Sequence, residues 1–62
     1  MLDMRAHLEK LRSDARDCAD ISKRATDAPK RELFANLSEH LNRLALEVEH
    51  ALAEQEKLDL PH

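Results

Sequence analysis

The chain has 62 residues, with one cysteine, one phenylalanine, no glycine, no tryptophan and no tyrosine, and its formal net charge is −3 at pH 7. A single cysteine excludes an internal disulfide, and the acidic balance argues against a general nucleic-acid or anionic-lipid binder. No basic segment followed by an apolar run opens the sequence and no stretch reads as a bilayer span, so we expect a cytoplasmic protein.

A first helix is predicted over residues 2–25. Apolar side chains recur in it at alternating steps of four and three residues: Met4, Leu8, Leu11, Ala15 and Cys18. This spacing places them on one narrow stripe of a helix. Asp3 near the start and Lys23 and Arg24 near the end suit the positive and negative ends of the helix dipole.

A turn is predicted at residues 26–29, because Pro29 lacks an N–H and disfavours a helical conformation in the residue before it. Asp27 or Thr26 is expected to cap a second helix over residues 29–57, followed by a frayed tail at 58–62. The second helix repeats the apolar spacing of the first: Phe34, Leu37, Leu41, Leu44, Val48 and Ala51.

Folding the chain back at the turn brings the two stripes together. Facing residues then have numbers that add up to about 55 or 56, as Cys18 with Leu37 and Leu11 with Leu44 do. We therefore predict an all-α fold, an antiparallel two-helix hairpin that forms a single domain over residues 1–62. One hairpin has only one helix–helix interface, so we expect two hairpins to dimerise into a four-helix bundle.

The residues beside the stripes predict where the second hairpin docks. On one flank three pairs are expected to face each other: His7 with Glu47, Asp14 with His40, and Ile21 with Leu33. The other flank has small or apolar side chains that would let another helix pack closely, and we assign the dimer contact to them. These are Ala19, Ser38, Ala45 and Leu52. Leu46 is expected to be exposed and to be a candidate contact for an unknown protein partner.

Glu47 and His50 have the Glu-x-x-His spacing that di-metal four-helix proteins use, which makes a di-metal bundle one alternative function. The inward stripe leaves both residues outside the core, so we predict no metal and no other cofactor. Cys18 has no histidine within one turn on its helical face, and we interpret it as a small core residue. No other pattern indicates catalysis, and we expect no enzyme activity.

Four cations crowd the turn and form a candidate anion-binding patch: Lys23, Arg24, Lys30 and Arg31. The alternative is a solvated turn balanced by Asp27 and Glu32. An RNA- or DNA-binding regulatory bundle is a further alternative function, but acidic residues interrupt the arginines of the first helix. The expected function is a non-catalytic protein–protein interaction or structural module that acts as a homodimer.

Two segments carry a resemblance to a known group of proteins. Residues 17–29 combine an acidic stretch around Cys18 with an Asp-x-Pro turn, and residues 37–45 read Leu-Ser-Glu-His-Leu-Asn-Arg-Leu-Ala. In these features the chain resembles short, functionally uncharacterised helical proteins common in alpha-proteobacteria. Their pattern has the proline directly after the aspartate and an aromatic residue where this chain has Leu41. The resemblance implies a small helical hairpin.

Overall fold

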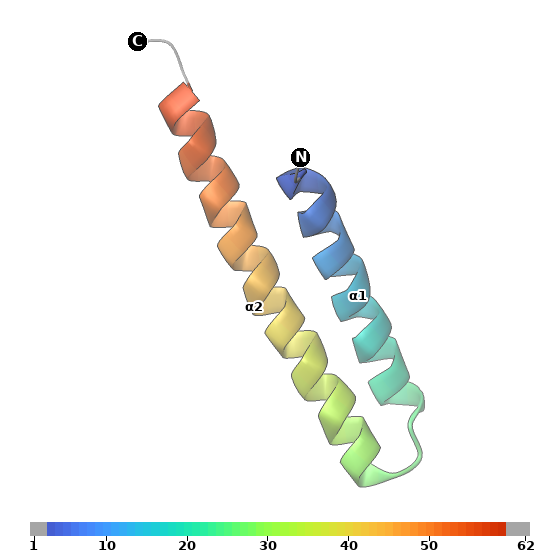
Figure 1. Cartoon of the computed structure of the whole chain (residues 1–62). Coiled ribbons are helices and arrows are strands. Elements are labelled where there is room, and N and C mark those ends of the chain that lie inside the picture. Colours follow the sequence, from blue (N-terminus) through green and yellow to red (C-terminus); the bar gives the residue numbers. More distant parts are fainter. Residues whose placement is uncertain (1–2, 60–62) are drawn as a thin grey trace.

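The computed structural model describes residues 3–59. In that range the chain forms two helices, α1 over Met4–Arg24 and α2 over Ala28–Asp59. The helices lie side by side and antiparallel, and α2 extends past the start of α1 (Figure 1). The prediction of an all-helical antiparallel hairpin is therefore confirmed.

The helix ends differ from the predicted ends by one or two residues, as helix ends commonly do. α1 ends one residue earlier than predicted, and α2 begins one residue earlier, at Ala28. α2 continues to Asp59, so the first two residues of the predicted frayed tail are helical. Pro61 restricts only the residue directly before it, which explains this continuation. Residue 2 of the predicted first helix and residues 60–62 of the predicted tail lie outside the described residues.

Aspartate side chains cap the start of both helices. The Asp3 carboxylate accepts two backbone N–H groups of the first turn of α1, at 3.1 and 3.3 Å. The Asp27 carboxylate accepts the Lys30 N–H at 3.1 Å, so Asp27 rather than Thr26 is the side-chain cap of α2. Pro29 falls in the first turn, where a missing N–H breaks no helical hydrogen bond.

The interior of the hairpin lies along the line where the two helices meet. Four apolar side chains are buried there: Leu8, Leu11, Ala15 and Ala45. Four partly buried side chains of α2 pack against this core: Leu41, Leu44, Val48 and Leu52. Because Ala15 and Ala45 are small, they let the two backbones approach closely.

α2 is rotated about its axis relative to the predicted packing. Leu37 is 39% exposed, although it was assigned to the inward stripe, and Ala51 is exposed as well. The inward positions are instead taken by Ser38 and Ala45, which are 8% and 4% exposed. The apolar residues of α2 span an arc wider than one stripe. The apolar pattern by itself is therefore compatible with two rotations of α2 about its axis.

Hydrogen bonds from two serine hydroxyls favour one rotation of α2 and one register between the two helices. Ser38 Oγ donates a hydrogen bond to the Ala15 carbonyl oxygen, and Ser22 Oγ donates one to the Arg31 carbonyl oxygen, both at 2.8 Å. Each helix thus supplies one serine that bonds to the backbone of the other. Both serines are buried, and a buried hydroxyl without a partner would cost free energy.

Candidate interaction surface

The hairpin has two long sides on which both α1 and α2 are accessible. These two flanks differ in the chemistry of their side chains. On the first, Arg5 pairs with Glu56 and Arg12 pairs with Glu49, so both ion pairs cross between the helices. The arginines are seven residues apart on α1 and the glutamates are seven apart on α2, which repeats the contact after two helical turns. We call this side the ionic flank. Its charged side chains border the core along one edge.

The second side of the hairpin carries exposed apolar side chains. Ile21 of α1 is 41% exposed, and Leu33 and Leu37 of α2 are 54% and 39% exposed. Each residue of an α-helix is rotated by about 100° around the helix axis from the residue before it. Ile21 therefore points about 180° away from Arg12 around α1, and Leu37 points about 120° away from Glu49 around α2. These leucines and Ile21 therefore lie away from the ionic flank.

We call this second side the apolar flank. It continues toward the open end of the hairpin through one half-buried leucine and four polar residues: Leu44, His7, Asp14, His40 and Glu47. A shallow hollow lies over the α2 part of this flank, lined by Leu33, Asn36, Leu37, Glu39, His40 and Arg43.

The structure corrects the predicted dimer contact. Ser38 and Ala45 are buried between α1 and α2, Leu52 packs against the core, and Ala19 is half-buried. The prediction that these residues lie free beside the core is wrong for Ser38 and Ala45, because the hairpin uses them for its own interior. Leu46 is 56% exposed, as predicted, but lies about 180° around α2 from Leu37.

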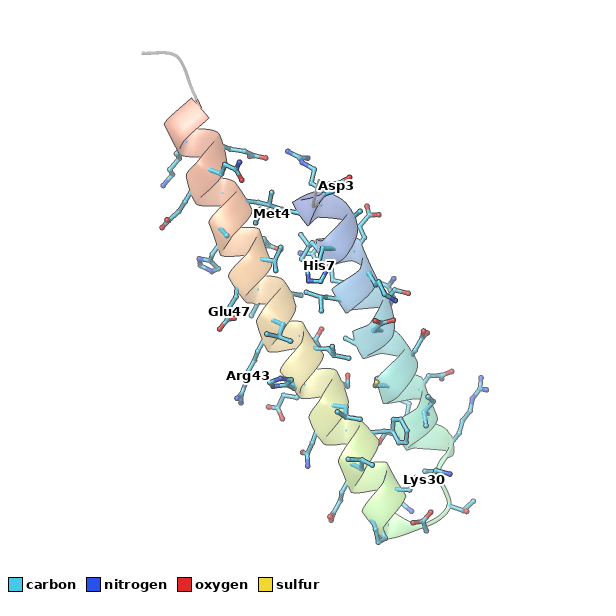
Figure 2. The ribbon with its side chains drawn as sticks, in the orientation of Figure 1. Asp3, Met4, His7, Lys30, Arg43 and Glu47 are labelled. Atoms are coloured by element: carbon cyan, nitrogen blue, oxygen red, sulfur yellow. The ribbon has the colours of Figure 1, made fainter. Side chains whose placement is uncertain are left out.

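The ion pairs predicted on the apolar flank do not form within one hairpin. Asp14 pairs with Lys10 of its own helix at 3.4 Å. In the part of the chain that the structure describes, no ion pair joins His7 to Glu47 or Asp14 to His40. His7 and Glu47 lie at about the same level along the rod, one on each helix (Figure 2). The flank therefore has acidic and histidine side chains at matching levels that are not joined by an ion pair within the hairpin.

The candidate anion-binding patch surrounds the turn as predicted from its positions, and all four cations are exposed. Arg24 already pairs with Asp20 at 3.2 Å, and the Arg31 guanidinium donates to the Thr26 carbonyl oxygen at 3.5 Å. At the start of α2 the Lys30 N–H already donates a hydrogen bond to the Asp27 carboxylate. Much of the donor capacity at the turn is thus used within the chain.

The remaining candidate residues are Glu47, His50 and Cys18. Glu47 and His50 are both exposed on α2, and no group of three or more His, Cys, Asp or Glu side chains in the described part could hold a metal ion. Cys18 is a half-buried free thiol. Within residues 3–59, neither helix combines the length and the apolar character needed to cross a membrane.

No protein-family model, curated protein or solved structure matches the chain. The resemblance to the alpha-proteobacterial helical proteins therefore stays a prediction, and the function has to be argued from the surface itself.

Sequence reasoning recognised Ile21 and Leu33 as neighbours but assigned docking to the other flank. One signal in the sequence could have separated the flanks. Arg5 and Arg12 have acidic counterparts on α2, Glu56 and Glu49, with the same spacing of seven, as expected for ion pairs along a helix–helix contact. A flank closed by such pairs is a poor place for an apolar contact.

Proposed function

We propose that the chain is a non-catalytic protein–protein interaction module, a homodimer in which two hairpins form a four-helix bundle through their apolar flanks. A cytoplasmic location belongs to this proposal, since a reducing compartment keeps a thiol such as that of Cys18 free.

The observation that carries the proposal is the large surface that one hairpin leaves exposed. The hairpin is a rod of 55 × 17 × 15 Å with an accessible surface of 5263 Å². A compact protein of 7.1 kDa exposes about 4,100 Å², so the hairpin has an excess of about 1,200 Å². An excess of this size is comparable to the area that each partner buries in an ordinary stable interface, about 800 Å².

The position of the half-buried Leu44 supports a bundle rather than a flat contact. Ala45 faces α1, and the neighbouring Leu44 is turned about 100° away from it, toward the apolar flank. In a square bundle of four helices each helix meets two neighbours on faces about 90° apart. α2 thus has one face occupied by α1 and a second apolar face at the angle where a further helix would lie.

A matched pair of substitutions tests the proposal. Leu37→Glu places a charge in the apolar flank, whereas Leu46→Glu places the same charge on a leucine that is also exposed but lies outside it. We expect sedimentation equilibrium to give a dimer for the unaltered chain and for Leu46→Glu, and a largely monomeric Leu37→Glu. Equal masses for the two variants would contradict the proposed contact.

A further inference from the structure

We infer that the two hairpins of the dimer lie with their turns at the same end, so that α1 of each hairpin packs on α2 of the other. In this arrangement Ile21 meets the partner's Leu33, Asp14 meets the partner's His40, and His7 meets the partner's Glu47. The inference rests on the proposed homodimer and specifies its pairing.

The two serine hydrogen bonds give the levels of the residues along the rod. They join residue 38 to the carbonyl of residue 15 and residue 22 to the carbonyl of residue 31, so each pair of numbers adds up to 53. A carbonyl oxygen points toward the C-terminal end of its helix, so side chains at equal levels have numbers that add up to about 54 or 55. On the apolar flank three pairs meet this condition, each adding up to 54: Ile21 with Leu33, Asp14 with His40, and His7 with Glu47.

These residues repeat every seven positions on both helices, at 7, 14 and 21 on α1 and at 33, 40 and 47 on α2. A spacing of seven keeps side chains on one face of a helix that packs against another. Both rows lie on the apolar flank, yet they make no ion pair with each other within one hairpin in the described part of the chain. A second copy of the same flank would set a histidine opposite each of these acidic residues.

A twofold axis parallel to the helices brings these rows together between hairpins. Such an axis preserves the level of every residue, so each α1 row meets the α2 row of the partner. The apolar residues then meet apolar residues near the turns, and each acidic residue meets a histidine toward the open ends. All three contacts occur twice in the dimer.

A twofold axis perpendicular to the helices gives poorer complementarity. It packs α1 on α1 and α2 on α2 of the partner with the turns at opposite ends. When this axis passes through the middle of the row from Leu33 to Leu44, Asp14 of each α1 lies against the partner's Asp17. Like charges in contact weaken association, so the charge pattern favours the arrangement with both turns at one end.

The arrangement is tested first by a distance within the dimer. In the full chain, Cys18→Ser removes the native thiol and Thr26→Cys provides one site for a spin label at the turn. With interaxial distances of 8–10 Å, double electron–electron resonance should find the two labels within about 20 Å. A distance of about 35 Å or more, expected from the helical rise for opposite turns, would overturn the pairing but leave the homodimer intact.

Mixing two charge variants tests the residue pairs themselves. Asp14→Lys sets a cation against the partner's His40, and His40→Glu sets a carboxylate against the partner's Asp14. We expect each variant alone to dimerise about tenfold more weakly, because Asp14→Lys removes the acidic partner of His40 from both contacts and His40→Glu sets two carboxylates against each other in both. A mixture of the two should recover dimer, since lysine at 14 then meets glutamate at 40 across the interface.

Contacts within one hairpin cannot produce this recovery, so the mixture separates pairing between chains from effects on folding. Circular dichroism should show helical content like that of the unaltered chain for both variants. A mixture no more dimeric than its components would overturn the pairing. An unaltered chain that stays monomeric at high concentration would overturn the proposed function and the pairing together.

Discussion

The hydroxyl of Ser38 on α2 donates a 2.8 Å hydrogen bond to the backbone carbonyl oxygen of Ala15 on α1, across the interior of the hairpin. The serine side chain is buried, and Ala15 is only 2% exposed. This contact places Ser38 inward and therefore turns Leu37, the preceding residue, toward the apolar flank. The exposure of Leu37 on the apolar flank thus depends on a contact inside the hairpin.

Ser38→Ala should lower the free energy of unfolding by about 1 kcal/mol, because the Ala15 carbonyl loses a buried hydrogen bond. Urea denaturation followed by circular dichroism measures this loss. Ser13→Ala is the control, since Ser13 is exposed on α1 and its replacement should leave stability unchanged or slightly raised. A Ser38→Ala variant as stable as the unaltered chain would mean that the hydrogen bond does not hold the register.

Ala45→Leu should destabilise the hairpin by about 1–3 kcal/mol, because a larger side chain in the buried contact between the helices forces them apart. Ala45 is 4% exposed, whereas Ala35 on the same helix is exposed. Ala35→Leu should therefore have little effect on the unfolding midpoint. If Ala45→Leu melted like Ala35→Leu, Ala45 would not lie inside the hairpin.

Asp27→Ala should cost about 1 kcal/mol of stability, because the Lys30 N–H loses its acceptor at the start of α2. Asp27→Asn keeps a side-chain oxygen in place and should cost only a few tenths of that. Thermal unfolding of the two variants side by side gives the comparison. An equal loss for alanine and asparagine would point to the charge of Asp27 rather than its capping hydrogen bond.

The Arg12–Glu49 ion pair should contribute less than about 1 kcal/mol, since both side chains are about half exposed and water screens their attraction. A double-mutant cycle with Arg12→Ala and Glu49→Ala measures the coupling energy, which should shrink further as salt is added. A coupling that is large and insensitive to salt would show that the ionic flank is shielded from solvent.

The helices and the turn could be predicted because their signals are local. Asp27 and Pro29 mark the start of α2 within three residues, and the spacing of Leu8 and Leu11 shows which side of α1 is apolar. The antiparallel packing then follows from the short connection. These features need no knowledge of contacts between distant residues.

The rotation of α2 could not be predicted in the same way. Leu37 and Leu44 form one apolar row, and Ala45 and Val48 belong to another, so hydrophobicity alone favours the row with the larger side chains. Contacts between the helices select the rotation. The Ser38 hydroxyl donates a hydrogen bond to the Ala15 carbonyl oxygen, and the small Ala45 permits close approach of the helices. The predicted dimer contact included Ser38 and Ala45, which are buried inside the hairpin for the same reason.

The mass of the unaltered chain in solution shows whether two hairpins associate. Sedimentation equilibrium over a wide range of micromolar concentrations should give twice the chain mass of 7.1 kDa at the upper end, with helical content rising or constant as dimer forms. A single species of 7.1 kDa at every concentration, cooperatively folded with its apolar flank open to water, would contradict the account.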